Sequence, residues 1–356
     1  MHRSTGPLSH VKVLDLSRIL AAPWASQTLA DLGADVIKVE RPGSGDDTRA
    51  WGPPFLKDGR GEDTEEAGYY LAVNRGKRSI TVGLDTPEGQ RVVRELAMRA
   101  DILLENYKVG TLARYGLDEA SLRALNPRLI YCSVTGFGQT GPRRDQPAYD
   151  FLIQAMGGLM SVTGERDGRP GGGPQKVGVP IVDLMTGMYT AVAVLAALAR
   201  RNETGKGEYI DIGMFDVQVA TLANQAMNYL VSGKPPRRNG NAHPNIQPQD
   251  IYRCADGDII LVVGNDGQFR KLCEALGHAQ WAADERYATN AQRVRNIEQL
   301  SAMLREDLAR RDRASLLALL DGAGVPCGPI NTVAEVFEEP QTIARGLLRH
   351  IEHPSG

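Results

Sequence analysis

The chain has 356 residues, which predicts two domains at roughly 150 residues per domain. Its hydrophobic share of 42% and charged share of 24% exclude a disordered tail, a collagen-like fibre and a disulfide-stapled miniprotein. The 41 basic and 43 acidic residues leave a formal net charge of -2. Because so weak a field does not attract nucleic acid or an anionic membrane, neither is expected as a partner.

Cysteine, histidine and apolar patterning limit compartment and cofactors. The longest apolar stretch, residues 189–199, is shorter than the roughly 20 residues of a membrane span, and residues 1–7 show no signal peptide. The four cysteines are widely spaced and form no CxxC pair, which predicts reduced thiols in a cytoplasmic protein. Histidine spacings typical of zinc or di-iron sites do not occur, so no metal or other cofactor is expected.

Residues 11–40 predict a strand, a helix and a strand. The strands are expected at 11–16 and 36–40, and the helix at 22–32, where Gly33 would end it as a C-cap. The alternation continues with an extended segment at 79–84, a helix from Thr86 to about residue 99 with proline in its first turn, a strand at 102–105, a helix at 117–125 and a strand at 129–134. Such alternation predicts an α/β fold with a Rossmann-like parallel sheet covered by helices on both faces.

Two irregular stretches interrupt this pattern. Residues 41–68 contain three prolines and six glycines and are too long for a plain connection, so they are predicted to be functional or mobile. Residues 165–180 lead into a helix rich in small residues at 184–201, followed by an extended run at 209–212 and a helix at 217–231.

A polar hinge at 233–241 then marks a change in composition. Beyond it we expect a strand at 258–263 and helices at 266–276 and 296–309. The predicted domains are a large α/β domain at 1–224 and a small α+β domain at 225–325. Residues 326–356 are expected to return to the large domain or cross to a partner.

The motifs that commonly hold a nucleotide on such a sheet are absent. The turn after the first strand, at residues 17–23, lacks GxGxxG, and neither a P-loop nor a GxSxG elbow occurs in the chain. The sheet is therefore expected to bind its ligand without the usual phosphate loop.

A series of motifs in order along nearly the whole chain resembles the family III CoA-transferases, the CaiB/BaiF group. They are the opening segments 11–16, 22–23 and 32–46, then NRGKRS at 74–79, ENY at 105–107, NPRLIY at 126–131, GFGQTGP at 136–142 and VPCGPI at 325–330. The resemblance implies an enzyme that transfers CoA from an acyl-CoA to a free carboxylic acid, with coenzyme A as a substrate.

The nucleophile of that family is an aspartate after a short apolar run, at the start of a helix rich in small residues. The matching segment is VPIVDLMTGM at 179–188, which assigns the role to Asp183. Taken alone, an aspartate there favours a helix N-cap, whose carboxylate accepts from the first free N–H groups. The two roles are compatible because a helix N-terminus stabilises the ionised carboxylate by about 0.3–1 kcal/mol.

The resemblance also marks residues around the acyl group. Tyr149 stands where racemases of the family carry histidine, and it either lines the acyl pocket or is a core tyrosine. Asp150 either orients groups around Asp183 or makes a structural hydrogen bond, and Trp51 either walls the pocket or is plain packing. Tyrosine, with a pKa of about 10 against about 6.5 for histidine, is a poor base at neutral pH. Transfer is therefore favoured over 2-methylacyl-CoA racemisation, and retention of Asp183 argues against a non-enzymatic CoA-binding protein.

Residues 239–247 occupy the place of the family's glycine-rich lid. Gly240, Asn241 and His243 are predicted to belong to the lid or the acyl pocket, and His243 either binds an acceptor carboxylate or stabilises the turn. Leu20 and Pro147 replace a glutamine and a lysine of some members, which argues against formyl-CoA:oxalate transfer. Segments 240–244 and 264–269 resemble members that use succinyl-CoA and related diacids.

Coenzyme A requires cations for its phosphates and flat or apolar contacts for adenine. Arg41 matches the adenine-contacting arginine of the family, and a guanidinium both stacks and bonds phosphate. The other residues predicted to bind CoA, all in the large domain, are Ile19, Leu20, Ala21, Asn106, Tyr107 and Arg114. The family fold implies an interlocked-ring homodimer, so a second copy is expected as the partner beside the acyl-CoA and acid substrates.

Overall fold

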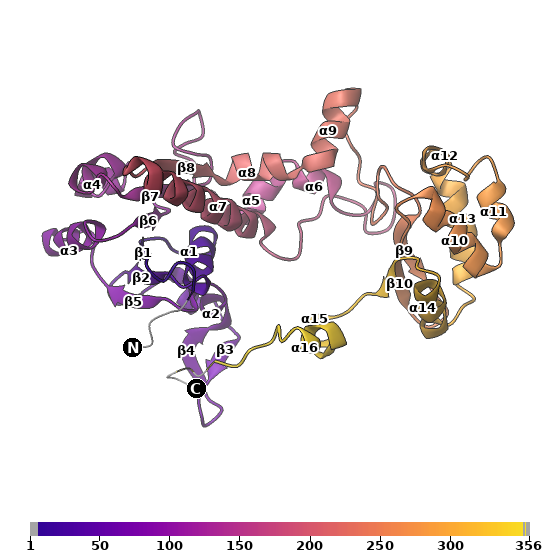
Figure 1. Ribbon diagram of the computed structural model, residues 1–356, viewed down its shortest axis with the longest axis horizontal. Helices are drawn as coiled ribbons and strands as arrows, with labels where there is room; N and C mark the ends of the chain where they lie inside the picture. Colours follow the sequence, from indigo (N-terminus) through magenta and orange to yellow (C-terminus); the bar gives the residue numbers. More distant parts are fainter. Residues whose placement is uncertain (1–5, 352, 354–356) are drawn as a thin grey trace. The chain divides into compact units, whose positions relative to one another are not determined.

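The computed structural model describes residues 6–351 and 353 and divides into two compact units (Figure 1). The large unit comprises the described residues up to 161 together with 176–236, and the small unit comprises 162–175 and 237–351. This partition differs from the division expected from composition, because the boundary follows Pro236 rather than residue 224 and the small unit recruits a loop from the middle of the large one.

The large unit is built on a six-stranded parallel sheet, which confirms the predicted α/β architecture. In spatial order the strands are β5 (Arg78–Thr81), β2 (Asp35–Glu40), β1 (Lys12–Asp15), β6 (Ile102–Glu105), β7 (Ile130–Thr135) and β8 (Tyr209–Gly213). The chain winds outward from β1 to β2 and β5, then returns to β6 on the other side of β1. The resulting switch point between β1 and β6 is where open α/β sheets bind ligands, at the carboxyl ends of the strands.

Helices cover both faces of this sheet. The large unit contains α1 (Ala21–Asp31), α2 (Gly68–Asn74), α3 (Pro87–Ala97), α4 (Glu119–Leu125), α5 (Asp150–Met156), α7 (Ile181–Thr204), α8 (Met214–Thr221) and α9 (Ala223–Ser232), with 3-10 turns η1 (Asp47–Ala50) and η2 (Leu112–Tyr115); α6 (Leu159–Val162) lies at the unit boundary. The predicted start of α3 is confirmed, since Thr86 accepts from the Gly89 N–H and Pro87 occupies the first turn.

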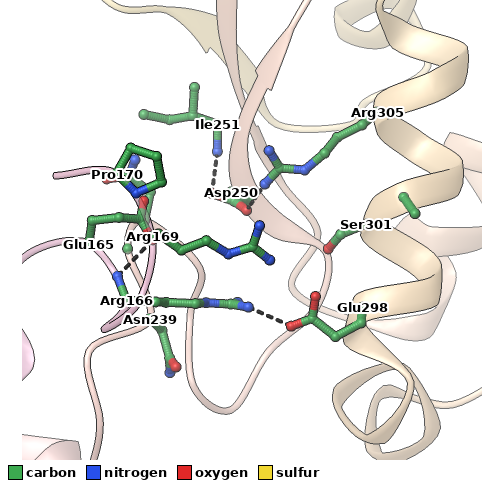
Figure 2. Close-up of a pocket in the computed structure, with 13 residues that line it drawn as sticks. Glu165, Arg166, Arg169, Pro170, Asn239, Asp250, Ile251, Glu298, Ser301 and Arg305 are labelled. Carbon is green, nitrogen blue, oxygen red and sulfur yellow. Dashed lines mark hydrogen bonds and ion pairs between the residues drawn. The ribbon is translucent and has the colours of Figure 1, made fainter. Parts of the chain in front are cut away.

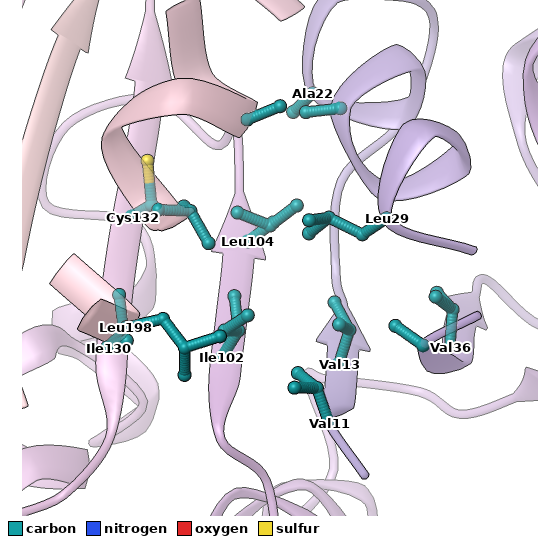
Figure 3. Packing of buried hydrophobic residues seen from close by; sticks show 14 of the residues in the cluster. Val11, Val13, Ala22, Leu29, Val36, Ile102, Leu104, Ile130, Cys132 and Leu198 are labelled. Atoms are coloured by element: carbon teal, nitrogen blue, oxygen red, sulfur yellow. The ribbon is translucent and has the colours of Figure 1, made fainter. Parts of the chain in front are cut away.

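Alternating strand residues feed two separate cores. On one face Val13, Leu104 and Ile130 pack with Leu29 of α1 and Leu198 of α7 (Figure 3). The opposite face carries a second cluster, formed with α3 and α4, that includes Leu14, Leu103 and Tyr131. Burial on both faces explains why the central strands are continuous apolar runs in the sequence.

Helix α7 is the one described helix long and apolar enough to cross a membrane by length and composition alone. It packs along α1 and against β7 and β8, and its Val194 and Leu198 are core residues. Its apolar character is therefore accounted for by packing within the large unit.

The long segment 41–68 forms defined structure. It contains η1 and an antiparallel hairpin of β3 (Phe55–Lys57) and β4 (Asp63–Ala67). Arg49 ties these parts to the sheet: its guanidinium donates to Glu40 at 2.8 and 2.9 Å, to Glu66 at 3.0 Å and to the Tyr70 hydroxyl at 2.7 Å. A second departure from expectation is the helix predicted at 217–231, which is two helices broken at Ala223, where φ is +46°.

The small unit has its own antiparallel sheet and its own core. The sheet order is β11 (Cys327–Pro329), β10 (Asp258–Val262) and β9 (Gln249–Arg253). The helices are α10 (Asp266–Leu276), α11 (Ala279–Ala283), α12 (Asn290–Arg295), α13 (Ile297–Leu308), α14 (Arg313–Gly322), α15 (Val333–Glu338) and α16 (Pro340–Ala344). Because β11 pairs with β10, the small unit extends beyond the expected limit at residue 325.

Candidate active site

The turn between β1 and α1 has a backbone conformation that its own sequence does not favour. Ile19 has φ of +71°, a left-handed value that a β-branched side chain rarely adopts. Its N–H donates to the Asp46 carboxylate at 3.2 Å. Asn106, just beyond β6, accepts from the Arg18 N–H at 3.0 Å and donates to the Arg18 carbonyl at 2.7 Å. Asp46 follows β2 and Asn106 follows β6, the two strands that flank β1. Side chains from both flanking segments therefore hold the turn in place.

Two buried ion pairs lie at the end of β1, next to this turn. Lys38 lies 2.8 Å from Asp46 and donates to the Ser17 carbonyl at 2.7 Å. Lys77 lies 3.1 Å from Asp15, and all four charged side chains are buried. Burial lowers the pKa of Lys77 to about 8, although the Asp15 carboxylate opposes this shift. Burial alone would raise the pKa of Asp15, but Lys77, Lys38 and hydrogen bonds from the Ser17 and Ser26 hydroxyls together outweigh it, and the net shift is downward.

Asp183 is the third residue of α7, because the N-cap is Pro180. The N-cap role considered for Asp183 is therefore wrong. The cap is supplied from α5 by Asp150, whose carboxylate accepts from the N–H of Val182 at 2.8 Å and of Asp183 at 3.2 Å. This contact leaves the Asp183 carboxylate without a hydrogen bond among the described residues.

The surroundings of Asp183 disfavour its charge. Burial raises its pKa from 3.8 to about 7, and the Asp150 carboxylate adds to the shift. Burial is the main cause that raises the pKa of Tyr69 at the start of α2, and the Asp183 and Asp150 carboxylates add to this shift. Trp51 packs edge-on against Tyr69 at 5.1 Å between ring centroids. Tyr69 was not singled out from the sequence, where it carries no motif; the fold brings it and Trp51 into the vicinity of the acidic pair.

A cavity of about 180 Å³ lies at the switch point of the sheet and joins these groups. Its lining contains Arg18, Ile19, Leu20, Ala21, Asn106, Tyr107, Lys108, Arg144, Tyr149, Asp183 and Met214. The structure thus gathers seven of the residues expected at the site, from four separate chain segments. The sequence did not single out Arg18, Arg144 and Met214, because basic and apolar residues without a motif resemble surface charge and core.

The two arginines expected to bind CoA have different settings. Arg41 shares Asp47 with Arg18, at 2.6 and 3.0 Å, and lines a small recess together with Tyr107. Arg114 is exposed on η2 and lies outside the lining of both the cavity and this recess.

The expected lid residues belong to the small unit. Gly240 and Asn241 line a cavity there, shown in Figure 2. His243 closes a local turn, because its Nδ1 accepts from the Asn245 N–H at 3.1 Å. Of the two roles considered for His243, this hydrogen bond supports stabilisation of the turn.

Comparison with known proteins gives concordant matches over nearly the whole chain. The sequence model of CoA-transferase family III matches residues 8–356. A succinate–glutarate CoA-transferase from Agrobacterium fabrum is 53% identical over 350 residues, covering 98% of this chain and 86% of that protein. A succinyl-CoA:glutarate CoA-transferase from Mus musculus is 43% identical over 352 residues, covering 99% and 78%.

A solved structure matches as well. The crystal structure of a CAIB/BAIF family protein from Brucella suis has a TM-score of 0.83 and 55% sequence identity. The match covers 96% of this chain and 88% of that one.

Proposed function

The chain belongs to CoA-transferase family III and is an enzyme of the CoA-transferase class, and from this premise we propose that it moves CoA from succinyl-CoA, or a related acyl-CoA, to a second dicarboxylic acid. The names of the Agrobacterium and mouse relatives support diacid substrates. The sequence segments that resemble succinyl-CoA-dependent members point the same way.

One observation carries the proposal: the Asp183 carboxylate faces the switch-point cavity without a hydrogen-bond partner among the described residues. A nucleophilic carboxylate must be ionised, near the thioester and uncommitted to other donors. A pKa of about 7 keeps Asp183 ionised in a substantial fraction at neutral pH and makes the anion more basic than an ordinary aspartate.

The proposed reaction uses two kinds of covalent intermediate on Asp183. A carboxylate oxygen attacks the donor thioester carbonyl and CoA thiolate leaves, which forms a mixed anhydride. The thiolate attacks the aspartyl carbonyl and releases the donor acid, which leaves an aspartyl-CoA thioester. The acceptor carboxylate attacks that thioester and expels the thiolate. Thiolate then attacks the acceptor acyl carbonyl, which gives the new acyl-CoA and restores the Asp183 carboxylate.

No proton is gained or lost in this sequence, and we propose that it needs no metal or other cofactor. The cavity must instead exclude water, since each anhydride is open to hydrolysis. The pinned turn at Ile19 and the residues around Asn106 are proposed to bind CoA on the large unit, together with Arg41.

We also propose that the enzyme is a homodimer of the interlocked type. Large apolar side chains are strongly exposed on α9 and along 333–351, including Leu230 at 72%, Val231 at 83%, Val333 at 78% and Ile351 at 71%. Exposed apolar surface of this kind marks an interaction site in soluble proteins. Light scattering should give twice the chain mass of 38.6 kDa, and a monomer at micromolar concentration would refute the dimer.

The catalytic proposal is tested by replacing Asp183 with alanine. Transfer between succinyl-CoA and glutarate, followed by mass spectrometry of the thioesters, should fall by about 10⁴-fold or more, as when other covalent nucleophiles are removed. CoA binding should be retained. Asp216→Ala is the matched control, because Asp216 occupies the same third position in α8 and is exposed.

The same incubation in heavy water discriminates the alternative reaction. A new thioester that appears only with a given acid supports transfer and identifies both substrates. Deuterium entering a 2-methylacyl-CoA without any new thioester would contradict the proposal and indicate a racemase.

A further inference from the structure

A second cavity lies wholly within the small unit and is larger than the one beside Asp183. Its volume is about 540 Å³, in the range of small-ligand sites. Its walls come from the loop 162–175, residues 239–241, β9 and α13 (Figure 2). The lining is polar and contains Glu165, Arg166, Arg169, Asn239, Asn241, Asp250, Glu298, Ser301 and Arg305.

Two of the three arginines in this cavity are neutralised by carboxylates. Arg166 pairs with Glu298 of α13 at 2.5 Å. Arg305 pairs with the largely buried carboxylate of Asp250 at 2.9 Å. The first pair links the loop 162–175 to α13, and the second links α13 to β9. Within each pair the two charges cancel.

The third arginine is different. The Arg169 side chain extends into the space between the other two arginines (Figure 2). Within the described residues it has no ion pair, and Glu165, the remaining acid of the wall, instead accepts from the backbone N–H of Arg166. The cavity therefore presents one guanidinium without an ion pair in the described part of the chain, and the Glu165 carboxylate in the same wall is also without one.

The backbone that carries Arg169 is fixed. Its N–H donates to the Arg166 carbonyl at 3.2 Å, and its carbonyl accepts from the Gly172 N–H at 2.9 Å. A Cβ at Gly172 would lie 2.5 Å from the Arg166 carbonyl oxygen, so only glycine permits this turn. Such a turn fixes the backbone from which the exposed Arg169 side chain extends, so binding has to order only the side chain.

We propose that this cavity binds a small dicarboxylic acid, with one carboxylate held by the Arg169 guanidinium. A guanidinium and a carboxylate match in geometry and form two parallel charge-assisted hydrogen bonds. The Asn241 amide lines the same space and supplies a neutral donor for the second carboxylate. The bound acid can be the acid substrate of the proposed transfer or a separate effector, and both present the same chemistry to the cavity.

The test measures the binding of glutarate to the full chain. Calorimetry gives the affinity, and the NMR signal of the Ile251 methyl group gives the location. Ile251 is in the lining of this cavity and not in that of the cavity beside Asp183. Glutarate should shift the Ile251 signal, and the neutral diamide glutaramide should not. Arg169→Leu should weaken the binding seen at Ile251 by roughly 10–100-fold, the value of hydrogen bonds to a charged group.

Arg270→Leu is the matched control, because Arg270 is an exposed arginine of the same unit that lies outside the cavity. Arg169→Lys retains the charge but not the bidentate geometry and should bind with intermediate affinity. An Ile251 signal that ignores glutarate, or an equal loss in the Arg169 and Arg270 variants, would overturn the proposal.

Steady-state transfer assays then separate the two sources of the acid. If Arg169→Leu raises the KM for glutarate but not for a monocarboxylic acceptor, the bound acid is the substrate. If transfer is unchanged while binding at Ile251 is lost, the acid is an effector, and the site stands. Failure of the chain to transfer CoA at all would refute the proposed function, while the binding measurement would still decide on this cavity.

Discussion

The cavity beside Asp183 and the cavity around Arg169 present unpartnered charges of opposite sign. In the large unit the charged groups below the β1–α1 turn are buried and paired, and one carboxylate faces the open space. In the small unit two arginines are paired with acids at the wall, and the Arg169 guanidinium and the Glu165 carboxylate form no ion pair among the described residues. In both places the paired charges fix the walls and the unpaired group is available for a ligand.

The two sites differ in how deeply this pairing is buried. Lys38 and Asp46 are almost inaccessible, whereas Glu298 is mostly exposed to solvent. Because water screens exposed charges but not buried ones, the large-unit pairs should matter for folding and the small-unit pairs mainly for local geometry. Asp46→Asn and Arg78→Leu test the contrast between a buried and an exposed pair, and substitutions at Asp183 and Asp150 test the unpaired carboxylate.

The largest effect is expected for Asp46→Asn. The substitution removes the carboxylate 2.8 Å from the buried Lys38 ammonium, leaves Asp15 as the counter-charge of both Lys38 and Lys77, and weakens the contact that holds Ile19 at positive φ. Loss of one partner of a buried pair costs about 3–5 kcal/mol. Chemical denaturation of the full chain should show a decrease of this size in the free energy of unfolding of the large unit. The KM for acyl-CoA should rise because the turn is released. A loss below 1 kcal/mol would contradict the structural role given to the pair.

Asp183→Asn should stabilise the protein at high pH. The folded-state pKa of Asp183 is raised to about 7 from an ordinary value of 3.8, so its stability contribution is full below pH 3.8 and is lost as pH rises through 7. At pH 8 the wild type therefore contains a destabilising buried anion that the variant lacks. Thermal melts should show the variant higher by several °C at pH 8, since a rise in pKa from 3.8 to about 7 corresponds to roughly 4 kcal/mol. The difference should vanish near pH 4, and a pH-independent difference would refute the assignment.

Asp150→Asn should shift the pH dependence of transfer. Wild-type activity is expected to rise as pH increases through about 7, because ionised Asp183 is the proposed nucleophile. The variant keeps an oxygen to accept from the N–H groups of Val182 and Asp183 but removes the like charge. The midpoint should move down yet stay above 3.8, since burial is the larger cause of the shift. An unchanged midpoint would mean that Asp150 acts on α7 through hydrogen bonding alone.

The smallest effect is expected for Arg78→Leu, which breaks the exposed pair with Asp35 on neighbouring strands. Exposed ion pairs contribute about 0–1 kcal/mol, so the denaturation midpoint should hardly change. This variant serves as the reference for Asp46→Asn, and a comparable loss in both would remove the distinction between buried and exposed pairs.

The sequence was informative wherever one residue pattern has one physical explanation. The short apolar runs at β6 and β7, within a chain that alternates strands and helices, indicate central strands of a parallel sheet, and Thr86 with Pro87 marks the start of α3. The hairpin β3–β4 was missed because its charged strand 63–67 lacks the alternation that indicates a half-buried strand.

At the site, the resemblance of the motifs to the family predicted Asp183 and the turn at Ile19, and both line the switch-point cavity. Length and the alternation of elements predicted two domains on an α/β plan. The residue pattern placed Asp183 at the helix cap, since periodicity locates the start of a helix only to within about a turn. Tertiary structure decided that Asp150 supplies the cap and that Tyr69 lies near both carboxylates.

Tertiary structure also decided that Arg169 is the arginine left unpaired. Whether a charged side chain is free depends on which partners the fold brings within about 4 Å. For Arg166 the partner is 132 residues away in the chain, and for Arg305 it is 55 residues away. Local sequence fixes the type of each charge and the helices and strands that carry it. The long-range packing of those elements determines which charges neutralise one another and which one remains to bind or react.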